Sequence, residues 1–195
     1  MAFVPFSARS KEWEPLAQQL RRKVSWPDRD AVAFDPWKLA PLVGLTVLEC
    51  SFQGLDAEEQ GYLSNHASGD WSGGVFAQFL PDGSRVCMLN PTHPRRRNKI
   101  TLMEEISHCF LGHTPTKLVA NGNGRVRDFE KAQEEEAFGI GAAVLLPWNL
   151  FFGCINAGGP VEEIADEFDV SQELIRYRIK ICGATYLYKS RCGRG

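Results

Sequence analysis

The chain has 195 residues, of which 44% are hydrophobic and 24% charged, a balance that is typical of soluble globular proteins and excludes disordered, collagen-like and coiled-coil chains. Its formal net charge is −2 with both signs interspersed, so the charge of the whole chain does not favour nucleic acid or an anionic membrane as a partner. No stretch approaches the roughly 18 apolar residues of a membrane span, and the first residues lack the pattern of a secretory signal. We therefore expect a cytoplasmic protein with one compact domain, a small appendage and no membrane contact.

The first predicted elements are two helices and a strand. Apolar residues at helical spacing predict a helix over 10–23, and the turn-rich stretch 27–36 ends it. A short helix is predicted over 37–43, with Gly44 at its end. The β-branched and apolar residues of 45–51 then predict a strand.

A hairpin and a helix follow after a polar connection. Residues 75–80 and 85–90 predict two strands joined by a tight turn, in which Gly83 supplies the positive φ. The stretch 90–99 contains two prolines and four basic residues and is predicted to be a solvated loop. A helix is predicted over 101–111.

The last third of the chain is predicted to be helical. A long polar loop that contains the sequence Asn-Gly-Asn-Gly at 121–124 leads to a helix over about 129–146, which stops at Pro147. Two short amphipathic helices over 160–168 and 171–182 then have the spacing of a helix-turn-helix. The two long helices, one on each side of the polar loop, are therefore expected to form the centre of the molecule.

The cysteines have no CxxC spacing, and the chain is long enough to fold without disulfides, so we interpret them as reduced thiols. The six are Cys50, Cys87, Cys109, Cys154, Cys182 and Cys192. Cys109 stands beside His108, and its thiolate could reach a metal bound nearby. A buried apolar cysteine is nevertheless the interpretation that we favour.

The chemically informative helix contains Glu104, Glu105 and His108. Residues four apart lie about one turn above each other, so Glu104 and His108 can bind one ion. In a zincin the corresponding sequence is HExxH, where two histidines hold zinc and the glutamate between them is the general base. The sequence here is EExxH, which on its own is more typical of a helix with a solvated face.

The flanking sequence resembles the ImmA/IrrE family of bacterial metallopeptidases. Residues 90–117, NPTHPRRRNKITLMEEISHCFLGHTPTK, resemble the family stretch in which an asparagine-proline loop precedes the zincin motif. Residues 133–147 resemble its second signature, a glutamate three residues before an alanine on a helix that ends in leucines and a proline. Weaker matches extend the resemblance over about 35–185; they are DPWKLA, Trp71-Ser-Gly and VEEIADEFDVSQELIRYRIKICG.

The resemblance implies an α+β fold. A zincin-like metallopeptidase core over 36–150, with a small antiparallel or mixed sheet against two long helices, would follow an N-terminal helical arm over 1–35. A C-terminal module with helix-turn-helix-like helices would occupy 151–195. The third zinc ligand of the family falls on Glu134, so the resemblance implies Zn²⁺ held by Glu104, His108 and Glu134, with Glu105 as the catalytic base.

Glu104 departs from the family, which has its first histidine at this position. A carboxylate can bind zinc, and three protein ligands with an open position remain possible. The added negative charge makes a bound water less acidic, so the alternative is an impaired or inactive relative. Of the other histidines, His113 lies about 140° round the helix from His108 and follows Gly112, a residue that can end the helix, so it is predicted to point elsewhere; His93 is predicted to lie on the surface. A di-iron site is discarded because the chain has no second E-x-x-H sequence.

A catalytic site of this kind also needs a hydrogen-bond donor to the oxyanion. Tyr177 and Arg178 fall in a segment that matches the family, and Arg178 is the candidate that we name as catalytic.

Three functions remain open. The resemblance implies a zinc metallo-endopeptidase that cleaves a partner protein, a transcriptional repressor of the XRE type. The second is a pseudo-peptidase that binds a protein and regulates it without cutting. The third and weakest is DNA contact, through the C-terminal helix pair or the three arginines at 95–97.

Overall fold

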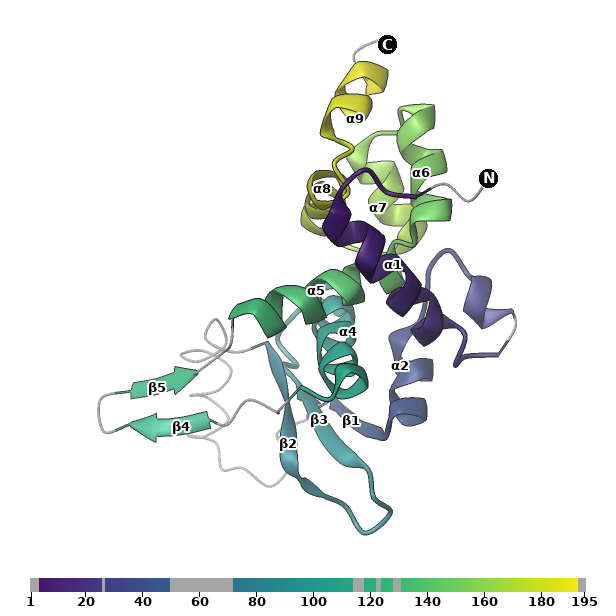
Figure 1. The fold of residues 1–195 in the computed structure, drawn as a ribbon. Coiled ribbons are helices and arrows are strands. Elements are labelled where there is room, and N and C mark those ends of the chain that lie inside the picture. The colour runs from purple at the N-terminus through teal and green to yellow at the C-terminus, as the bar shows by residue number, and fades with distance from the viewer. Residues whose placement is uncertain are drawn as a thin grey trace.

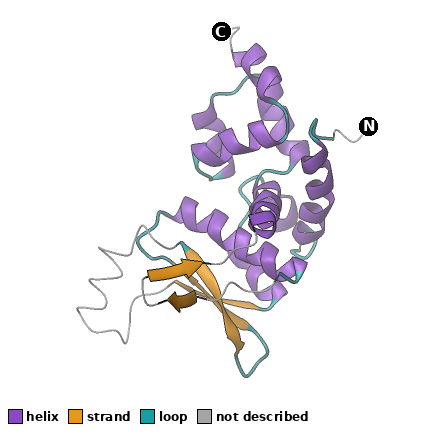
Figure 2. Cartoon of the chain, turned by 60° about the vertical axis from the view of Figure 1, so that its left-hand side comes forward, coloured by secondary structure: helices purple, strands orange, loops and turns teal. Residues whose placement is uncertain are grey.

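The computed structural model describes residues 4–25, 27–49, 72–113, 118–121, 124–127 and 131–192. The strands gather on one side of an α+β molecule, and helices make up the rest (Figures 1 and 2). The elements in chain order are α1 Ala8–Arg21, η1 Asp28–Asp30, α2 Pro36–Leu39, η2 Ala40–Val43, β1 Leu45–Glu49, β2 Gly73–Phe79, β3 Arg85–Leu89, α4 Arg95–Leu111, β4 Leu118–Asn121, β5 Gly124–Arg127, α5 Lys131–Leu145, α6 Trp148–Ala157, α7 Val161–Phe168, α8 Gln172–Ile181 and α9 Thr185–Cys192.

A mixed three-stranded sheet has the order β1-β3-β2. β1 runs parallel to β3 with Leu45 opposite Arg85, and β2 runs antiparallel to β3 with Gly73 opposite Leu89. Gly83 has a φ of 81° in the turn between β2 and β3. The predicted hairpin and the predicted first strand are both confirmed.

The two long helices α4 and α5 lie at the centre, as predicted, and α1 covers α5 (Figure 1). Trp13 of α1 is 5% exposed, and its ring fills the space beside Gly139 of α5. A Cβ atom at position 139 would lie 2.1 Å from that ring, so only glycine permits this close approach. The predicted arm thus packs against the helix that carries Glu134, while the predicted division at 35/36 and 150/151 stays a prediction.

The prediction of a loop over 90–99 is confirmed for 90–94 and wrong for 95–99, because α4 already begins at Arg95. Pro94 is its N-cap, a place where the missing N–H costs no helical hydrogen bond, and the amide of Arg97 donates to the Pro94 carbonyl at 2.8 Å. The basic residues therefore form the first turn of the helix. The guanidinium of Arg95 lies 4.2 Å from the centre of the Trp37 ring.

The prediction of a long loop before α5 is also wrong in part, because β4 and β5 pair there as an antiparallel ribbon. Val119 lies opposite Val126 and Asn121 opposite Gly124 in the ribbon, and a Gly-Asn pair between two strands is a known sequence signal for a hairpin. Two helices were not predicted at all: Pro147 ends one helix but is also the N-cap of α6, and α9 follows Gly183. The predicted connection over residues 52–70 lies outside the described residues.

The C-terminal helices α7 and α8 are confirmed, and α4 holds them in place. Asp169, in the left-handed conformation at φ 51°, ends α7. The Lys99 ammonium donates to the Asp169 carbonyl at 3.0 Å and to its carboxylate at 3.1 Å, and Nε of Arg96 donates to the same carboxylate at 3.0 Å. The helix α4 carries the EExxH sequence, and its first turns therefore hold the turn between α7 and α8.

Within the described residues, no single helix is both long and apolar enough to cross a membrane. Among the described helices, a sufficient apolar length arises where α5 and α6 are joined, and these two helices meet at a bend of 70°.

Candidate metal centre

The helix α4 has a buried face and a face that carries the candidate ligands. Leu102, Met103 and Ile106 are fully buried in the hydrophobic core. Glu104 and His108 lie one turn apart beside this face and remain partly exposed. The core contacts thus fix the orientation of the helix, and the helix orients both ligands in the same direction.

The helix α5 supplies the third candidate ligand from across a close helix contact. A Cβ atom at Gly141 would lie 3.2 Å from the Met103 main chain, so the two backbones approach each other closely there. Near the beginning of α5, Glu134 faces His108. Later residues of α5 therefore meet earlier residues of α4, and the two helices pass each other in opposite directions.

Glu104, His108 and Glu134 are brought together by this packing. One ligand atom from each lies within 4.8 Å of the others. The Nε2 atom of His108 is 3.2 Å from Oε1 of Glu134, and the two side chains are 14% and 30% exposed. Among the described residues, no further group of three or more such side chains is close enough to hold a metal.

The carboxylates of this group strongly affect each other. Burial raises the pKa of Glu104 to about 8, and the charges of Glu134 and Glu105 and a hydrogen bond with Glu134 act in the same direction. Burial lowers the pKa of His108, but the hydrogen bond and charge of Glu134 and the charges of Glu105 and Glu104 outweigh it, so that this pKa is raised. The cluster thus favours the binding of positive charge, as a proton or as a cation.

Zinc fits this set of donors. Ligands about 2.0–2.2 Å from a tetrahedral zinc ion lie about 3.3–3.6 Å from each other, so the present separation needs only a small closure. Two carboxylates and one imidazole are all accepted ligands of Zn²⁺. A divalent cation would also compensate the charge repulsion that raises the pKa of Glu104.

The raised pKa of Glu104, caused mainly by burial and also by the neighbouring carboxylates, predicts a pH-dependent stability of the metal-free protein. The folded pKa of Glu104, about 8, exceeds the ordinary value of 4.5, so the folded chain keeps a proton that the unfolded chain has released. The stabilisation is therefore complete below about pH 4.5 and is lost as the pH rises through about 8. Glutamine at position 104 mimics the protonated acid at every pH. We expect Glu104→Gln to be more stable than the unaltered protein by about 4 kcal/mol at about pH 8 and by almost nothing at about pH 4.5.

Chemical denaturation of chelator-treated protein at several pH values measures this difference. An advantage of Glu104→Gln that stays constant with pH would contradict the burial of a carboxylate at this position.

The prediction that His113 points away from the site is wrong. Gly112, with a φ of 72°, ends α4 in a left-handed conformation, and the amide of His113 donates to the His108 carbonyl at 2.9 Å. The angle of about 140° between His108 and His113, which assumes a continuous helix, therefore does not describe their positions. The imidazole folds back against His108, with 2.9 Å between the two Nδ1 atoms. Gly112 is a sequence signal for the helix end, but the direction of the chain after it is given only by the structure.

Glu105 and Cys109 lie on the side of α4 that faces β3. The charge of Glu105 raises the pKa of Cys87 on β3 and of Cys109, after burial as the larger cause in both cases. Nη2 of Arg85 lies 3.2 Å from the Cys109 sulfur. Cys109 is thus not a member of the metal group. Because its pKa is raised, its side chain is a thiol rather than a thiolate. Glu105 is close enough to raise the pKa of both Glu104 and His108.

Arg178 is fully buried away from the metal group. Its guanidinium forms an ion pair with Glu14 of α1 and donates from Nε to the Leu146 carbonyl at 3.1 Å. These contacts connect α8 with α1 and the end of α5, and the structure does not bring Arg178 together with the metal ligands. The hydroxyl of Tyr177 is buried without a hydrogen-bond partner among the described residues, and its ring lies edge-on to Phe138 at 4.9 Å.

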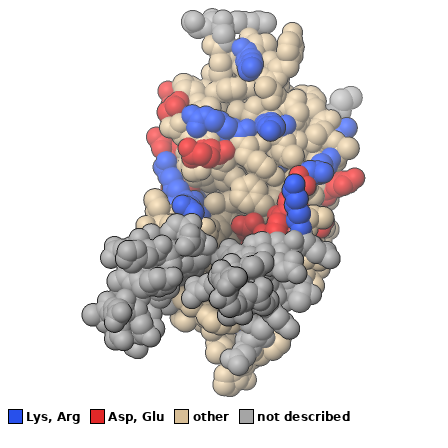
Figure 3. Space-filling model, turned by 90° about the vertical axis from the view of Figure 1, so that its left-hand side faces the viewer, with Lys and Arg blue, Asp and Glu red and all other residues tan. Residues whose placement is uncertain are grey.

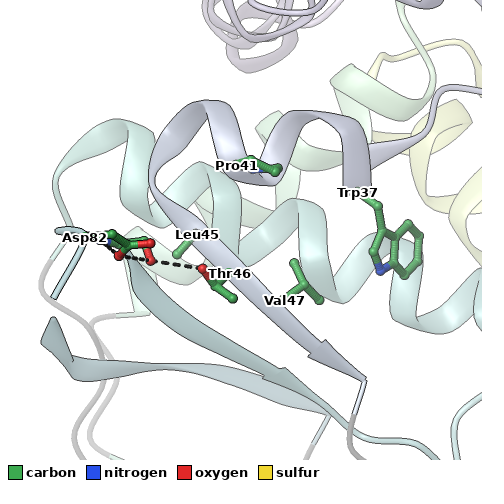
Figure 4. Close-up of a pocket in the computed structure, with 7 residues that line it drawn as sticks. Trp37, Pro41, Leu45, Thr46, Val47 and Asp82 are labelled. Carbon is green, nitrogen blue, oxygen red and sulfur yellow. Dashed lines mark hydrogen bonds between the residues drawn. The ribbon is translucent and has the colours of Figure 1, made fainter. Parts of the chain in front are cut away.

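A hollow of the described surface lies at the β1 edge and not at the metal group. It has a volume of about 390 Å³ and is open to solvent. Figure 4 shows Trp37 at one end and Asp82 at the other, where hydrogen bonds connect Asp82, Ser84 and Thr46. The residues that line it are Trp37, Pro41, Leu45, Thr46, Val47, Asp82 and Ser84.

Comparison with known proteins gives a match to a family model. The family model described as Peptidase_M78, IrrE N-terminal-like domain, matches residues 44–180, which include the three candidate ligands. Comparison with curated proteins and with solved structures gives no match. The matched segment covers most of the chain and relates it to metallopeptidases, which are hydrolases of proteins. The chain therefore belongs to the ImmA/IrrE family of metallopeptidases.

Proposed function

We propose that this protein is a zinc metallo-endopeptidase whose metal is held by Glu104, His108 and Glu134. The observation that carries the proposal is the convergence of these three side chains from two helices within 4.8 Å, inside the segment that matches the family. Three protein ligands with a position left open are typical of catalytic zinc, whereas structural zinc has four.

The residues of the chain have distinct tasks in this reaction. Zinc, when bound, acts as a Lewis acid and increases the acidity of water. A carboxylate oxygen of Glu105 takes a proton from the water as its oxygen attacks the carbonyl carbon of the peptide bond. The carbon-nitrogen bond then breaks, and the same carboxyl group passes the proton to the nitrogen that leaves. Nε2 of His108 stays directed toward the two carboxylates with which His108 would hold the metal.

The substrate that we propose is a transcriptional repressor of the XRE type, which the protein would cleave to relieve repression. The resemblance of the motif-bearing segments to ImmA/IrrE proteins supports this substrate class, and a cytoplasmic location is consistent with it. DNA is not supported as a further partner. Arg178 is buried, Arg176 lies 3.9 Å from Glu173, and charges of both signs intermingle on the face in Figure 3.

A second candidate is a pseudo-peptidase that binds a protein without cutting it. The observation that favours it is the pKa of about 8 for Glu104, because such a carboxyl group is largely protonated near neutral pH in the metal-free protein. Zinc must displace that proton, so the site binds metal less readily than one with histidine at this position.

The first experiment measures the metal content of protein purified without added metal, beside Glu104→His treated identically. The proposed peptidase requires nearly one zinc per chain in the unaltered protein, together with cleavage of a repressor of the XRE type that a chelator abolishes. Zinc and cleavage that occur only in Glu104→His would instead establish the pseudo-peptidase. Metal in neither protein would contradict both the ligand set and the peptidase.

A further inference from the structure

The side chains of His108, His113 and Glu136 form a chain of contacts that ends at the metal group. The two Nδ1 atoms of the histidines are 2.9 Å apart, and their ring centres are 5.0 Å apart at an interplanar angle of 64°. Nε2 of His113 is 3.6 Å from Oε2 of Glu136 on α5. Nε2 of His108 faces Glu134 on the other side. The contacts therefore run from a carboxylate through two imidazoles toward the ligands.

The protonation pattern of such a chain is constrained. A histidine that binds zinc through Nε2 has its proton on Nδ1, since a neutral imidazole carries one proton. The His108 Nδ1–H then donates to Nδ1 of His113, which must accept. The proton of His113 is left on Nε2, which is the atom that faces the carboxylate of Glu136. The Nδ1–H of His108 then has an acceptor within hydrogen-bond distance, whereas the Nε2–H of His113 faces a carboxylate that is 3.6 Å away, beyond that distance.

We propose that His113 is a positioning residue, which accepts a hydrogen bond from Nδ1 of His108 and so holds the Nε2 lone pair toward the metal. The inference rests on the proposed function, because it assumes that His108 binds a metal. Histidines that bind metals almost always donate their second ring N–H to an outer partner, and loss of such a partner typically lowers metal affinity 10- to 100-fold. Here the outer partner is a second histidine rather than the usual carboxylate or carbonyl group.

The local fold holds His113 for this task. Gly112 reverses the chain after α4, and the amide of His113 is bound to the His108 carbonyl, so both residues are fixed to the same turn. The side chain of His113 is only 10% exposed, while that of Glu136 is 43% exposed. His113 is thus the fixed member of the pair, and Glu136, at a longer distance, contributes less.

The test compares the zinc affinity of the unaltered protein with those of two variants, measured by competition with a chelating indicator. His113→Phe keeps a ring and removes the acceptor, and we expect it to bind zinc about 10- to 100-fold more weakly. His113→Asn retains a side-chain oxygen near the place of Nδ1, and we expect it to restore most of this loss. Equal losses in both variants would indicate a packing role and overturn the proposal, as would the absence of a loss in His113→Phe.

A spectroscopic measurement decides the hydrogen bond itself. In ¹⁵N-labelled, zinc-loaded protein, a scalar coupling between the two Nδ1 atoms across the N–H···N bond is expected, and it must vanish in His113→Phe. Absence of this coupling in the unaltered protein would overturn the proposal.

Both measurements are repeated in the Glu104→His background. If the unaltered chain binds no zinc, the proposed function fails, but this background still shows whether His113 positions His108.

Discussion

Glu105→Gln is expected to lower the rate of peptide-bond hydrolysis about 10²- to 10⁴-fold, the usual contribution of a general base, while the protein keeps its zinc. Glutamine has nearly the shape of glutamate, but its amide cannot accept a proton from water. Glu105 lies next to Glu104 in the chain and influences the pKa of both Glu104 and His108, so it is near the metal group without being a member of it. Loss of cleavage without loss of zinc is the result that distinguishes a general base from a metal ligand.

The measurement is the initial rate of repressor cleavage at saturating zinc, together with the zinc content of the same samples. Glu163→Gln is the matched control, because it makes the same chemical change at an exposed position of α7, and its rate should not differ from that of the unaltered protein. Unchanged cleavage in Glu105→Gln would exclude Glu105 as the base. Loss of zinc together with loss of cleavage would instead assign Glu105 a ligand role.

Much of the site could be predicted from the sequence, because its ligands follow from local periodicity. Residues 104 and 108 lie on one face of a helix by their spacing, and Glu134 follows from the match of a second motif to the family. The relation between the two helices was not predictable in this way. The small residue at 141 permits a close approach, but its partner, the Met103 main chain, is given only by the packed structure.

The expected direction of His113 is wrong because helical spacing does not extend past the end of α4. The left-handed conformation of Gly112 takes His113 out of the periodicity and returns it to His108. The early start of α4 was missed for a similar reason: prolines and arginines resemble a loop in composition, although a proline just ahead of a helix is well tolerated. Patterns predicted the interiors of the elements better than their ends.

Arg178 was misjudged for a different reason, since its partner is distant in the sequence. Periodicity cannot predict that a carboxylate of the first helix meets the guanidinium of α8. Glu14 is 6% exposed, pairs with Arg178, and also accepts the amide N–H of Trp148 at 3.1 Å. One buried carboxylate thus connects α1 with the beginning of α6 and with α8.

The second large effect is expected at this buried carboxylate: Glu14→Ala should lower the free energy of unfolding by about 3–5 kcal/mol. Removing Glu14 leaves the charge of Arg178 fully buried, with the Leu146 carbonyl as its other described acceptor. An uncompensated buried charge costs far more than the loss of an exposed ion pair. Urea denaturation of the metal-free protein measures the difference, and Glu12→Ala, an exposed position of the same helix, should change stability by less than about 0.5 kcal/mol.

A double-mutant cycle separates the pair from its surroundings. Arg178→Met fills part of the same space without a charge, and in combination with Glu14→Ala it should cost clearly less than the sum of the two single changes. Strict additivity would mean that the two side chains do not form an ion pair in solution. The helix α1 also packs Trp13 against Gly139 of α5, the helix that carries Glu134. Coupling between Glu14 and Arg178 therefore means that α5 is held in place by residues from both ends of the chain.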